Sequence, residues 1–557
     1  MSSSLPSFAR PVLALAFPLL LSACGGGGSS GGELASALVT ETATTRTSAT
    51  ASESFPTGLV VASPVELSGA AAEVSTSTMA RALAVPLGAG AGRAELTDMA
   101  ARIEAVLAGD TSVSLGGLLS FGNLFLQGSN AGCYGPQLLY ANHEDGSGTA
   151  SGLLPGGDLG LWLPTDAASG QPCVVAQLNA RTAGVKHATR QGLLLMAVMR
   201  ATVTGSGGTL SMPAAGFRTD LTTPFSTVLA ALPALTGWTV HAATVSLDPF
   251  GKTYTYRLAV SRDAGTSAGR SGEIVLQHRP GATAAAYSGV LRVAGFDLAS
   301  DATFGCSDRM TSGRYQRARV TTVRYSRQAD QIDFGARSGQ YCGAPADLAD
   351  TDYASQVASL ATNELDPAEQ LPAGAPGSAV VAGTSTGWRG NFDRFGGRYD
   401  RTTGAGQFLY AWQAGTGDSH ARALAVSSSY DSAADSRTVQ GYFAFTDALA
   451  TTDGSLLGMV CSWAGPGAVH TPAARFQSQT ATLAGLASTF VATASHLGYA
   501  PTNACASTTT VFDANADGTL AAGEGQGTLP ALDAPASPAV SVQDELVSRG
   551  YRQPGYF

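Results

Sequence analysis

The chain has 557 residues, enough for two to four domains, and hydrophobic residues make up 44% of it, enough for packed cores. Only 13% of its residues are charged, and it contains 68 glycines, which is typical of an exported β-rich protein with many turns. The net charge of −9 argues against a nucleic-acid partner, which would need a basic face.

The first predicted element is an N-terminal export signal, residues 1–23. One basic residue, Arg10, precedes an apolar run from Val12 to Leu21 that is too short to span a membrane. The signal ends in Leu21-Ser22-Ala23-Cys24, which resembles the lipobox of bacterial lipoproteins. In that family the cysteine is acylated and becomes the lipid anchor, so the resemblance implies cleavage before Cys24 and a membrane partner. The alternative is an ordinary secretory signal followed by a stray cysteine.

Residue 25, which follows the predicted anchor, is glycine and not the aspartate that commonly marks inner-membrane retention in lipoproteins. The resemblance therefore implies an outer-membrane location. Residues 24–92 are rich in Gly, Ser, Thr and Ala, and this composition predicts a flexible tether.

An α+β module is predicted over residues 93–235. Apolar residues from Leu96 to Leu107 share a helical face, and a second helix is predicted to begin at Pro172. That helix includes Leu193-Leu194-Leu195-Met196, but Arg190 and Arg200 bracket too few residues for a membrane span, so packing against a core is expected.

Two β-rich modules are predicted next, over 236–370 and 371–557. Segments rich in Val, Thr and Tyr, separated by Gly and Pro turns, indicate short antiparallel strands in a sandwich or open barrel. They include Thr239–Leu247, Thr253–Val260 and Ala318–Tyr325 in the first module, and Gln407–Trp412 and Val439–Phe445 in the second. The fold class expected is therefore mainly β with a smaller α+β N-terminal module.

If Cys24 carries lipid, an even number of cysteines remains, which in an oxidising compartment predicts three disulfides. Fifteen connectivities exist, but the spacing favours sequential pairs because partners are then only roughly 40 residues apart. A metal site would need closer cysteine pairs or nearby histidines. The predicted pairs are Cys133 with Cys173, Cys306 with Cys342, and Cys461 with Cys505.

The sharpest motif is the twelve-residue stretch from Asp513 to Glu524, which resembles the calcium loop of EF-hand proteins. This resemblance implies a Ca²⁺ cofactor bound by Asp513, Asn515, Asp517, the Thr519 carbonyl and Glu524. A strand-forming segment precedes the loop, and glycines and a proline follow it. These flanks predict a structural calcium clip without the helices of a sensor. An acidic turn without metal is the alternative.

Aromatic and arginine residues alternate early in the last module. Aromatic rings stack on sugars and arginines bind carboxylates or phosphates. This pattern suggests a ligand-binding face made of Trp388, Arg389, Arg398, Tyr410 and Trp412. Ordinary strand alternation, with aromatics inward and arginines outward, explains it as well.

No catalytic residue is identified from the sequence. Two G-x-S-x-G matches, at Ser267 and Ser385, lack the strand–serine–helix setting of a nucleophile elbow. The expected function is a calcium-stabilised, non-catalytic binding, adhesion or envelope-structure module on the outer membrane, with a polysaccharide or a surface protein as partner. A lipid-anchored hydrolase of a polysaccharide or polyester is the alternative.

Overall fold

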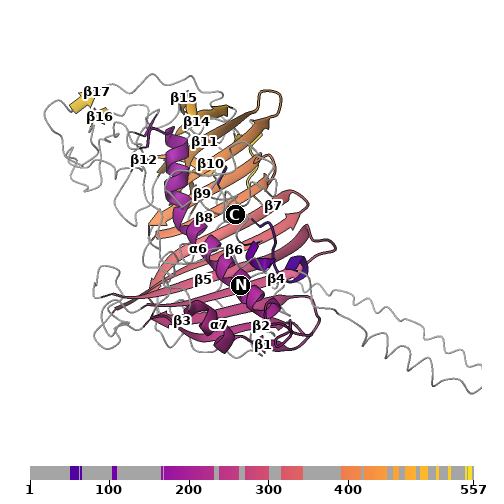
Figure 1. The fold of residues 1–557 in the computed structure, drawn as a ribbon. Coiled ribbons are helices and arrows are strands. Elements are labelled where there is room, and N and C mark those ends of the chain that lie inside the picture. The colour runs from indigo at the N-terminus through magenta and orange to yellow at the C-terminus, as the bar shows by residue number, and fades with distance from the viewer. Residues whose placement is uncertain are drawn as a thin grey trace, which may run out of the picture. The chain divides into compact units, whose positions relative to one another are not determined.

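The fold comes from a computed structural model of the chain. It describes residues 51–59, 61, 63–64, 103, 105–108, 165–166, 169–230, 237–262, 270–299, 315–342, 391–414, 420–447, 456–462, 471–473, 475–484, 490–499, 510–512, 525–527, 546–547 and 550–554. All of them belong to one compact unit, Ser48–Phe557. They form a wide antiparallel sheet with one long helix lying across it (Figure 1).

The sheet has 15 strands. The first seven are β1 (Arg218–Asp220), β2 (Thr239–Leu247), β3 (Tyr254–Arg262), β4 (Arg270–Pro280), β5 (Ala286–Ala299), β6 (Tyr315–Gln328) and β7 (Gln331–Cys342). The remaining eight are β8 (Asn391–Asp400), β9 (Gly406–Ala414), β10 (His420–Asp431), β11 (Ser436–Asp447), β12 (Leu456–Ser462), β13 (Thr471–Ala473), β14 (Arg475–Ala484) and β15 (Val491–Tyr499).

Consecutive strands are neighbours from β1 to β13, so most of the sheet is a simple meander. The sheet forks at β11. Its residues 436–443 pair with β14, which in turn pairs with β15, whereas Phe445 and Thr446 pair with β12. A separate two-stranded ribbon joins β16 (Thr510–Phe512) to β17 (Gly525–Gly527).

The long helix is α6, Cys173–Thr204, and it begins where the sequence predicts. A helix of 32 residues is about 48 Å long, close to the width of ten strands at about 4.8 Å each. It contacts strands from β3 to β14 and so crosses most of the sheet. The first turn of α6 contacts the C-terminal part of the sheet, where the Val174 amide donates to Gln479 Oε1 on β14 over 2.8 Å.

Glycines let α6 approach the strands closely. A Cβ at Gly192 would lie 2.9 Å from Val293 Cγ2 and 3.2 Å from a Leu291 methyl, both on β5. Gly441 on β11 packs in the same manner against Val174. Because a side chain at these positions would push helix and sheet apart, the glycines fix the depth of the helix on the sheet.

The core lies mainly between α6 and one face of the sheet, which we call the helix face. Side chains alternate between faces along each strand, and on β3 Tyr256 and Leu258 are buried on the helix face. Arg257 and Ala259 are equally buried on the opposite face. β3 is therefore buried on both faces and does not show clean apolar–polar alternation, which makes it harder to recognise from sequence.

The prediction of a mainly β, antiparallel fold is confirmed. The separate N-terminal α+β module is not supported, because α6 packs across the sheet and β1 is paired with β2 within it. Strands β1 to β15 also form one sheet rather than the two stacked sheets of a sandwich. In the part of the chain described, no helix is both long and apolar enough for a membrane span.

The predicted disulfides are not seen. Cys173 is buried at the start of α6 and is not in a disulfide within the described residues. Its predicted partner, Cys133, lies outside them, as do Cys306 and Cys505. Cys342 and Cys461 fall in β7 and β12, without described side chains. The pairing therefore stays a prediction.

Part of the predicted tether is packed. Within 24–92, the described residues include α2 (Ala51–Ser54) and the segment after it. We call residues 51–59, 61 and 63–64 the docked segment. Phe55, Leu59 and Val61 are buried in the same apolar core as α6 and the helix face.

Candidate functional site: a row of arginines across the sheet

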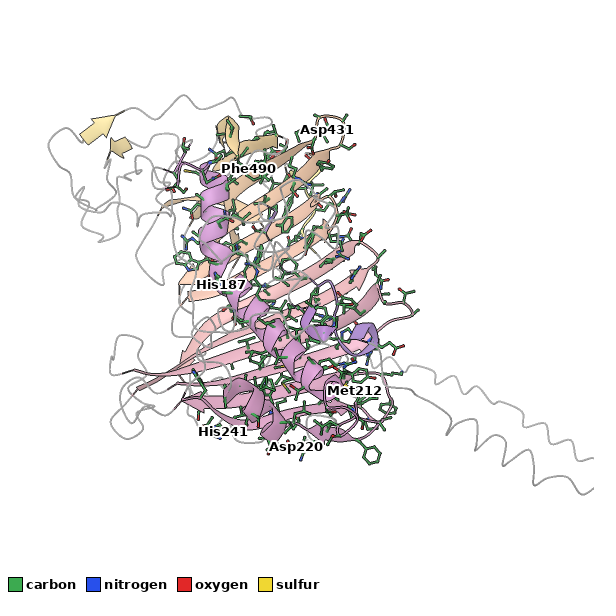
Figure 2. The ribbon with its side chains drawn as sticks, in the orientation of Figure 1. His187, Met212, Asp220, His241, Asp431 and Phe490 are labelled. Carbon is green, nitrogen blue, oxygen red and sulfur yellow. The ribbon has the colours of Figure 1, made fainter. Side chains whose placement is uncertain are left out.

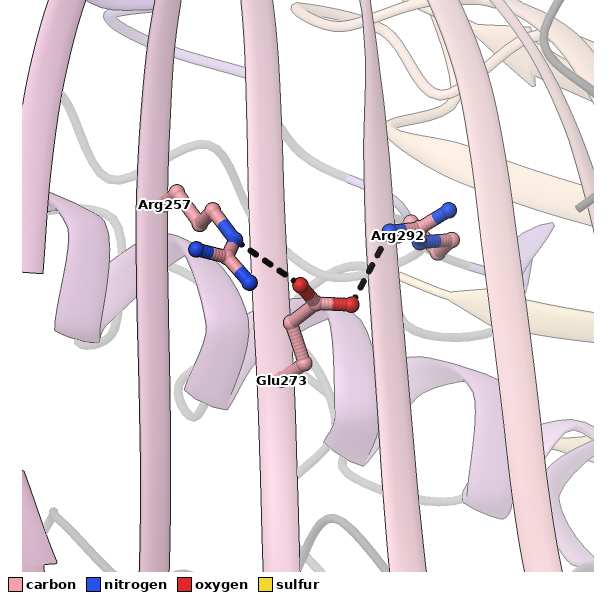
Figure 3. A network of polar contacts seen from close by, with 3 residues as sticks. All are labelled: Arg257, Glu273 and Arg292. Carbon is pink, nitrogen blue, oxygen red and sulfur yellow. Dashed lines mark hydrogen bonds and ion pairs between the residues drawn. The ribbon is translucent and has the colours of Figure 1, made fainter. Parts of the chain in front are cut away.

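The most distinctive polar cluster lies on the sheet face opposite α6. Glu273 on β4 is bridged by two arginines from the neighbouring strands (Figure 3). Arg257 Nε donates to Glu273 Oε1 over 2.9 Å, and Arg292 Nη2 donates to Oε2 over 3.0 Å. The side chains are 4%, 1% and 11% exposed for Arg257, Glu273 and Arg292. Each carboxylate oxygen therefore has its own buried guanidinium partner.

This cluster continues into a longer row because of the strand register. Arg257 is aligned through Val275 with Arg292, and Arg292 through Thr322 with Arg337. Arg337 is then directly opposite Arg394 on β8. We call Arg257, Arg292, Arg337 and Arg394 the arginine row. Side chains in one register row point to the same face, so four guanidinium groups from β3, β5, β7 and β8 share it.

The row carries an excess of positive charge. Arg324 on β6 lies on the same face, diagonal to Arg292 and Arg337. Glu273 on β4 also lies on this face, diagonal to Arg257 and Arg292. These six residues carry five positive charges and one negative charge. Like charges directly opposite in a sheet repel each other, and Arg337 faces Arg394 in this way.

Access to the row differs along its length. Arg257 and Arg394 are almost completely buried, whereas Arg324 and Arg337 are half-buried. Arginine offers a planar fork of donors that matches carboxylate or phosphate oxygens in bidentate fashion. Arg324 and Arg337 are thus the members of the face best placed to contact a ligand, while Glu273 holds the opposite end in place.

The structure separates the residues that the sequence analysis grouped as a ligand-binding face. Tyr410 and Trp412 on β9 lie on the helix face, where Tyr410 donates to Asp393 over 2.7 Å and Arg181 of α6 stacks 4.7 Å from the Trp412 ring. Arg398 lies on the opposite face and bridges Asp333 at 2.6 Å. Trp388 and Arg389 lie outside the described residues.

The calcium ligands also lie outside the described residues, which include none of the stretch 513–524. The ribbon on either side is described, and it pairs Phe512 with Gly525 directly across the ends of the loop. The strand predicted before the loop is confirmed as β16. Cys24 and the lipobox are likewise outside the described part of the chain.

A second polar pair, on β2 and β3, has the residue types of a nucleophile and a base. The His241 Nε2 and Ser261 Oγ atoms are 2.6 Å apart in an exposed position, and Figure 2 shows His241 at the α7 (Thr222–Ala230) end of the sheet. Among the described residues no carboxylate is hydrogen-bonded to His241 Nδ1. A serine–histidine pair without an orienting acid is an incomplete catalytic triad.

Apart from these two clusters, the polar side chain of His278 on β4 is buried on the helix face. It is 0% exposed, and neither ring nitrogen has a hydrogen-bond partner among the described residues. Its ring packs edge-on against Tyr287 at 5.3 Å. Burial lowers the pKa of His278 to about 3, so its imidazole is neutral at physiological pH.

Sequence analysis missed the arginine row. Its members are spread over nearly 140 residues, and only the pairing of β3 through β8 aligns them. The available signal was a single arginine inside predicted strands, such as Arg257 in Thr253–Val260 and Arg324 in Ala318–Tyr325, which reads as ordinary solvent exposure.

Comparison with known proteins adds no assignment: no family model, no curated protein and no solved structure matches this chain.

Proposed function

We propose that this chain is a lipid-anchored protein of the outer membrane that binds an anionic envelope component through the arginine row and catalyses no reaction. The observation that carries the binding proposal is the register that places Arg257, Arg292, Arg337 and Arg394 in one row. The ligand chemistry that fits is a polymer bearing carboxylate or phosphate groups, since repeated anions would match guanidinium groups repeated across the strands.

The location is proposed from the lipobox-like Leu21–Cys24 and the glycine at position 25. Two or more acyl chains on Cys24 would supply a durable anchor, at about 0.8 kcal/mol for each buried methylene. Calcium bound by the loop 513–524 would stiffen the region after β15 and would have a structural role only.

The anchor is tested by replacing the cysteine. In the wild-type chain we expect the protein in the membrane fraction, with an acylated N-terminal cysteine detected by mass spectrometry. Cys24→Ala should move it to the soluble fraction. An unmodified Cys24, or a C24A protein that stays membrane-bound, would contradict the anchor.

The binding site is tested by titrating the purified full chain with two anionic polymers, polygalacturonate for carboxylates and polyphosphate for phosphates. Arg324→Gln and Arg337→Gln should each weaken binding about tenfold, because each removes a charge-assisted hydrogen bond of roughly 1.5 kcal/mol. Arg218→Gln on β1, exposed and outside the row, is the matched control and should bind as wild type.

The comparison of the two polymers shows whether carboxylate or phosphate is recognised, because the polymer bound more tightly at 150 mM NaCl carries the preferred group. Affinity should fall as salt rises, since half-exposed charges are screened. Failure of both polymers to bind, or equal binding by wild type and the R324Q/R337Q double variant, would overturn the proposal.

The alternative function, a hydrolase, is favoured by one observation, the 2.6 Å contact between His241 and Ser261. A reactive serine would be labelled by a fluorophosphonate probe, and Ser261→Ala would abolish the label. Labelling that persists in S261A, or no labelling at all, counts against Ser261 as a nucleophile and leaves the binding function as the proposal.

A further inference from the structure

The docked segment is held on the helix face by four side chains that come from distant parts of the chain. Tyr256 on β3, Tyr287 on β5, Arg327 on β6 and Arg200 on α6 each donate a hydrogen bond to it. We call these four residues the tyrosine–arginine surface.

Three of the four hydrogen bonds recognise the main chain. Tyr256 Oη donates to the Ser54 carbonyl over 2.8 Å. The Thr57 carbonyl accepts from Tyr287 Oη over 2.8 Å and from Arg327 Nη1 over 2.9 Å. Only Arg200 Nε addresses a side chain, the Ser54 hydroxyl, over 2.7 Å. Donors aimed at carbonyl groups recognise peptide backbone, as in sites that bind peptide segments.

Two features of the segment add sequence preference. The Phe55 ring packs edge-on against Tyr256 at 6.1 Å, and Phe55 is 1% exposed. Gly58 has φ of +66°, and a Cβ there would lie 2.8 Å from Arg327 Nη1 and 3.3 Å from Arg401 Nη1. The positive φ favours glycine at position 58, and the two guanidinium groups lie close above it.

The docked segment is held without the strand pairing that joins the rest of the sheet. Among the described residues no strand pairing includes the docked segment, and its helix α2 has four residues. The segment is thus bound through side-chain donors and apolar contacts, much as a ligand is, whereas the strands beneath it are paired continuously.

We propose that the tyrosine–arginine surface is a peptide-binding site, occupied in cis by the docked segment, and that this segment exchanges with a free peptide of the same sequence. The peptide recognised has an aromatic residue directly after the carbonyl that Tyr256 binds, as Phe55 follows Ser54. It has a glycine directly after the carbonyl that Tyr287 and Arg327 bind, as Gly58 follows Thr57.

The test uses the full chain with a protease site inserted between residues 70 and 71. After cleavage, the N-terminal fragment should stay with the body on gel filtration. A fluorescein-labelled peptide of residues 51–64 should then replace it, seen as a rise in fluorescence anisotropy. The same peptide added to uncleaved chain should bind at least tenfold more weakly, because the tethered segment competes at high effective concentration.

Variants localise the binding. In the cleaved protein, Tyr287→Phe should weaken the labelled peptide about fivefold and Arg327→Gln about tenfold, in line with a neutral and a charged hydrogen bond. Peptides carrying Phe55→Ala or Gly58→Ala should bind at least tenfold more weakly. The control peptide Glu53→Gln changes an exposed side chain and should bind as wild type.

Three results would overturn the proposal. The first is unfolding of the cleaved chain, which would make the segment an integral part of the fold. The second is a cleaved chain that stays folded but exchanges no peptide over several days at 1 mM. The third is binding of the G58A and F55A peptides as tightly as the wild-type peptide.

Discussion

Arg257 and Glu273 form a 2.9 Å ion pair in which both side chains are almost completely buried, at 4% and 1% exposure. Burying charge is unfavourable unless it is paired, so each partner depends on the other. Glu273 also accepts from Arg292, which makes it the single negative charge between two buried guanidinium groups.

We therefore expect Glu273→Gln to destabilise the fold by about 3–5 kcal/mol, because it leaves two buried cations without their carboxylate. The measurement is urea unfolding followed by circular dichroism. Asp333→Asn is the matched control, since it breaks the Arg398 ion pair, in which the arginine is 49% exposed, and should change stability by less than about 1 kcal/mol. Similar losses in the two variants would show that the buried network has no special role.

His278 should make the fold acid-sensitive. Its pKa is about 3 in the folded protein, against a usual value of 6.5, so protons bind preferentially to the unfolded chain. Stability is then fully present above pH 6.5 and is lost as the pH falls from 6.5 toward 3, by up to about 1.4 kcal/mol for each pH unit.

His278→Leu removes the titrating ring and its two unpaired nitrogens. Between pH 7 and pH 5 it should lose about 2 kcal/mol less stability than the wild type, measured by unfolding at each pH. An H278L protein as acid-sensitive as wild type would assign the effect to other groups.

Gly192 should not tolerate a methyl group, although alanine is the better helix former. Gly192→Ala places a Cβ 2.9 Å from Val293 Cγ2, and we expect overpacking to destabilise the fold by about 1–3 kcal/mol. Val293→Ala in the same chain provides the room and should recover part of that loss, so a double-mutant cycle measures the contact. A G192A protein as stable as wild type would show that α6 can shift on the sheet.

Calcium should stabilise the chain through the loop 513–524. We expect millimolar Ca²⁺ added after EDTA to raise the melting temperature, because the ion binds the folded form. Asp517→Ala should abolish this rise, while Asp431→Asn, at the end of β10, should keep it. An unchanged melting temperature in the wild type would reduce the loop to an acidic turn.

Much of the secondary structure could be predicted locally. The helix beginning at Pro172 is confirmed, and the segment Thr239–Leu247 coincides with β2. β7 was missed although its first half alternates, with Ile332, Phe334 and Ala336 buried. Glycine and aspartate, which are depleted in strands, interrupt this segment and weaken the strand signal.

The candidate site could not be predicted in the same way. Arg337 and Arg394 are 57 residues apart in sequence, yet the β7–β8 register makes them direct neighbours. Tyr410 and Arg398 are close in sequence, yet alternation along β8 and β9 puts them on opposite faces. Periodicity reports which residues share a face of one strand, and it carries no information on which strands pair.

The sequence by itself determined the antiparallel β character, the long helix and the expectations of a lipid anchor and a calcium loop, because these follow from local patterns of a few to about thirty residues. Only the tertiary structure decided that the strands from β1 to β15 join one sheet, that four arginines align across it, and that the docked segment packs in the same core as α6. Those features depend on contacts between distant residues, where strand register and close packing, rather than local propensity, select the neighbours.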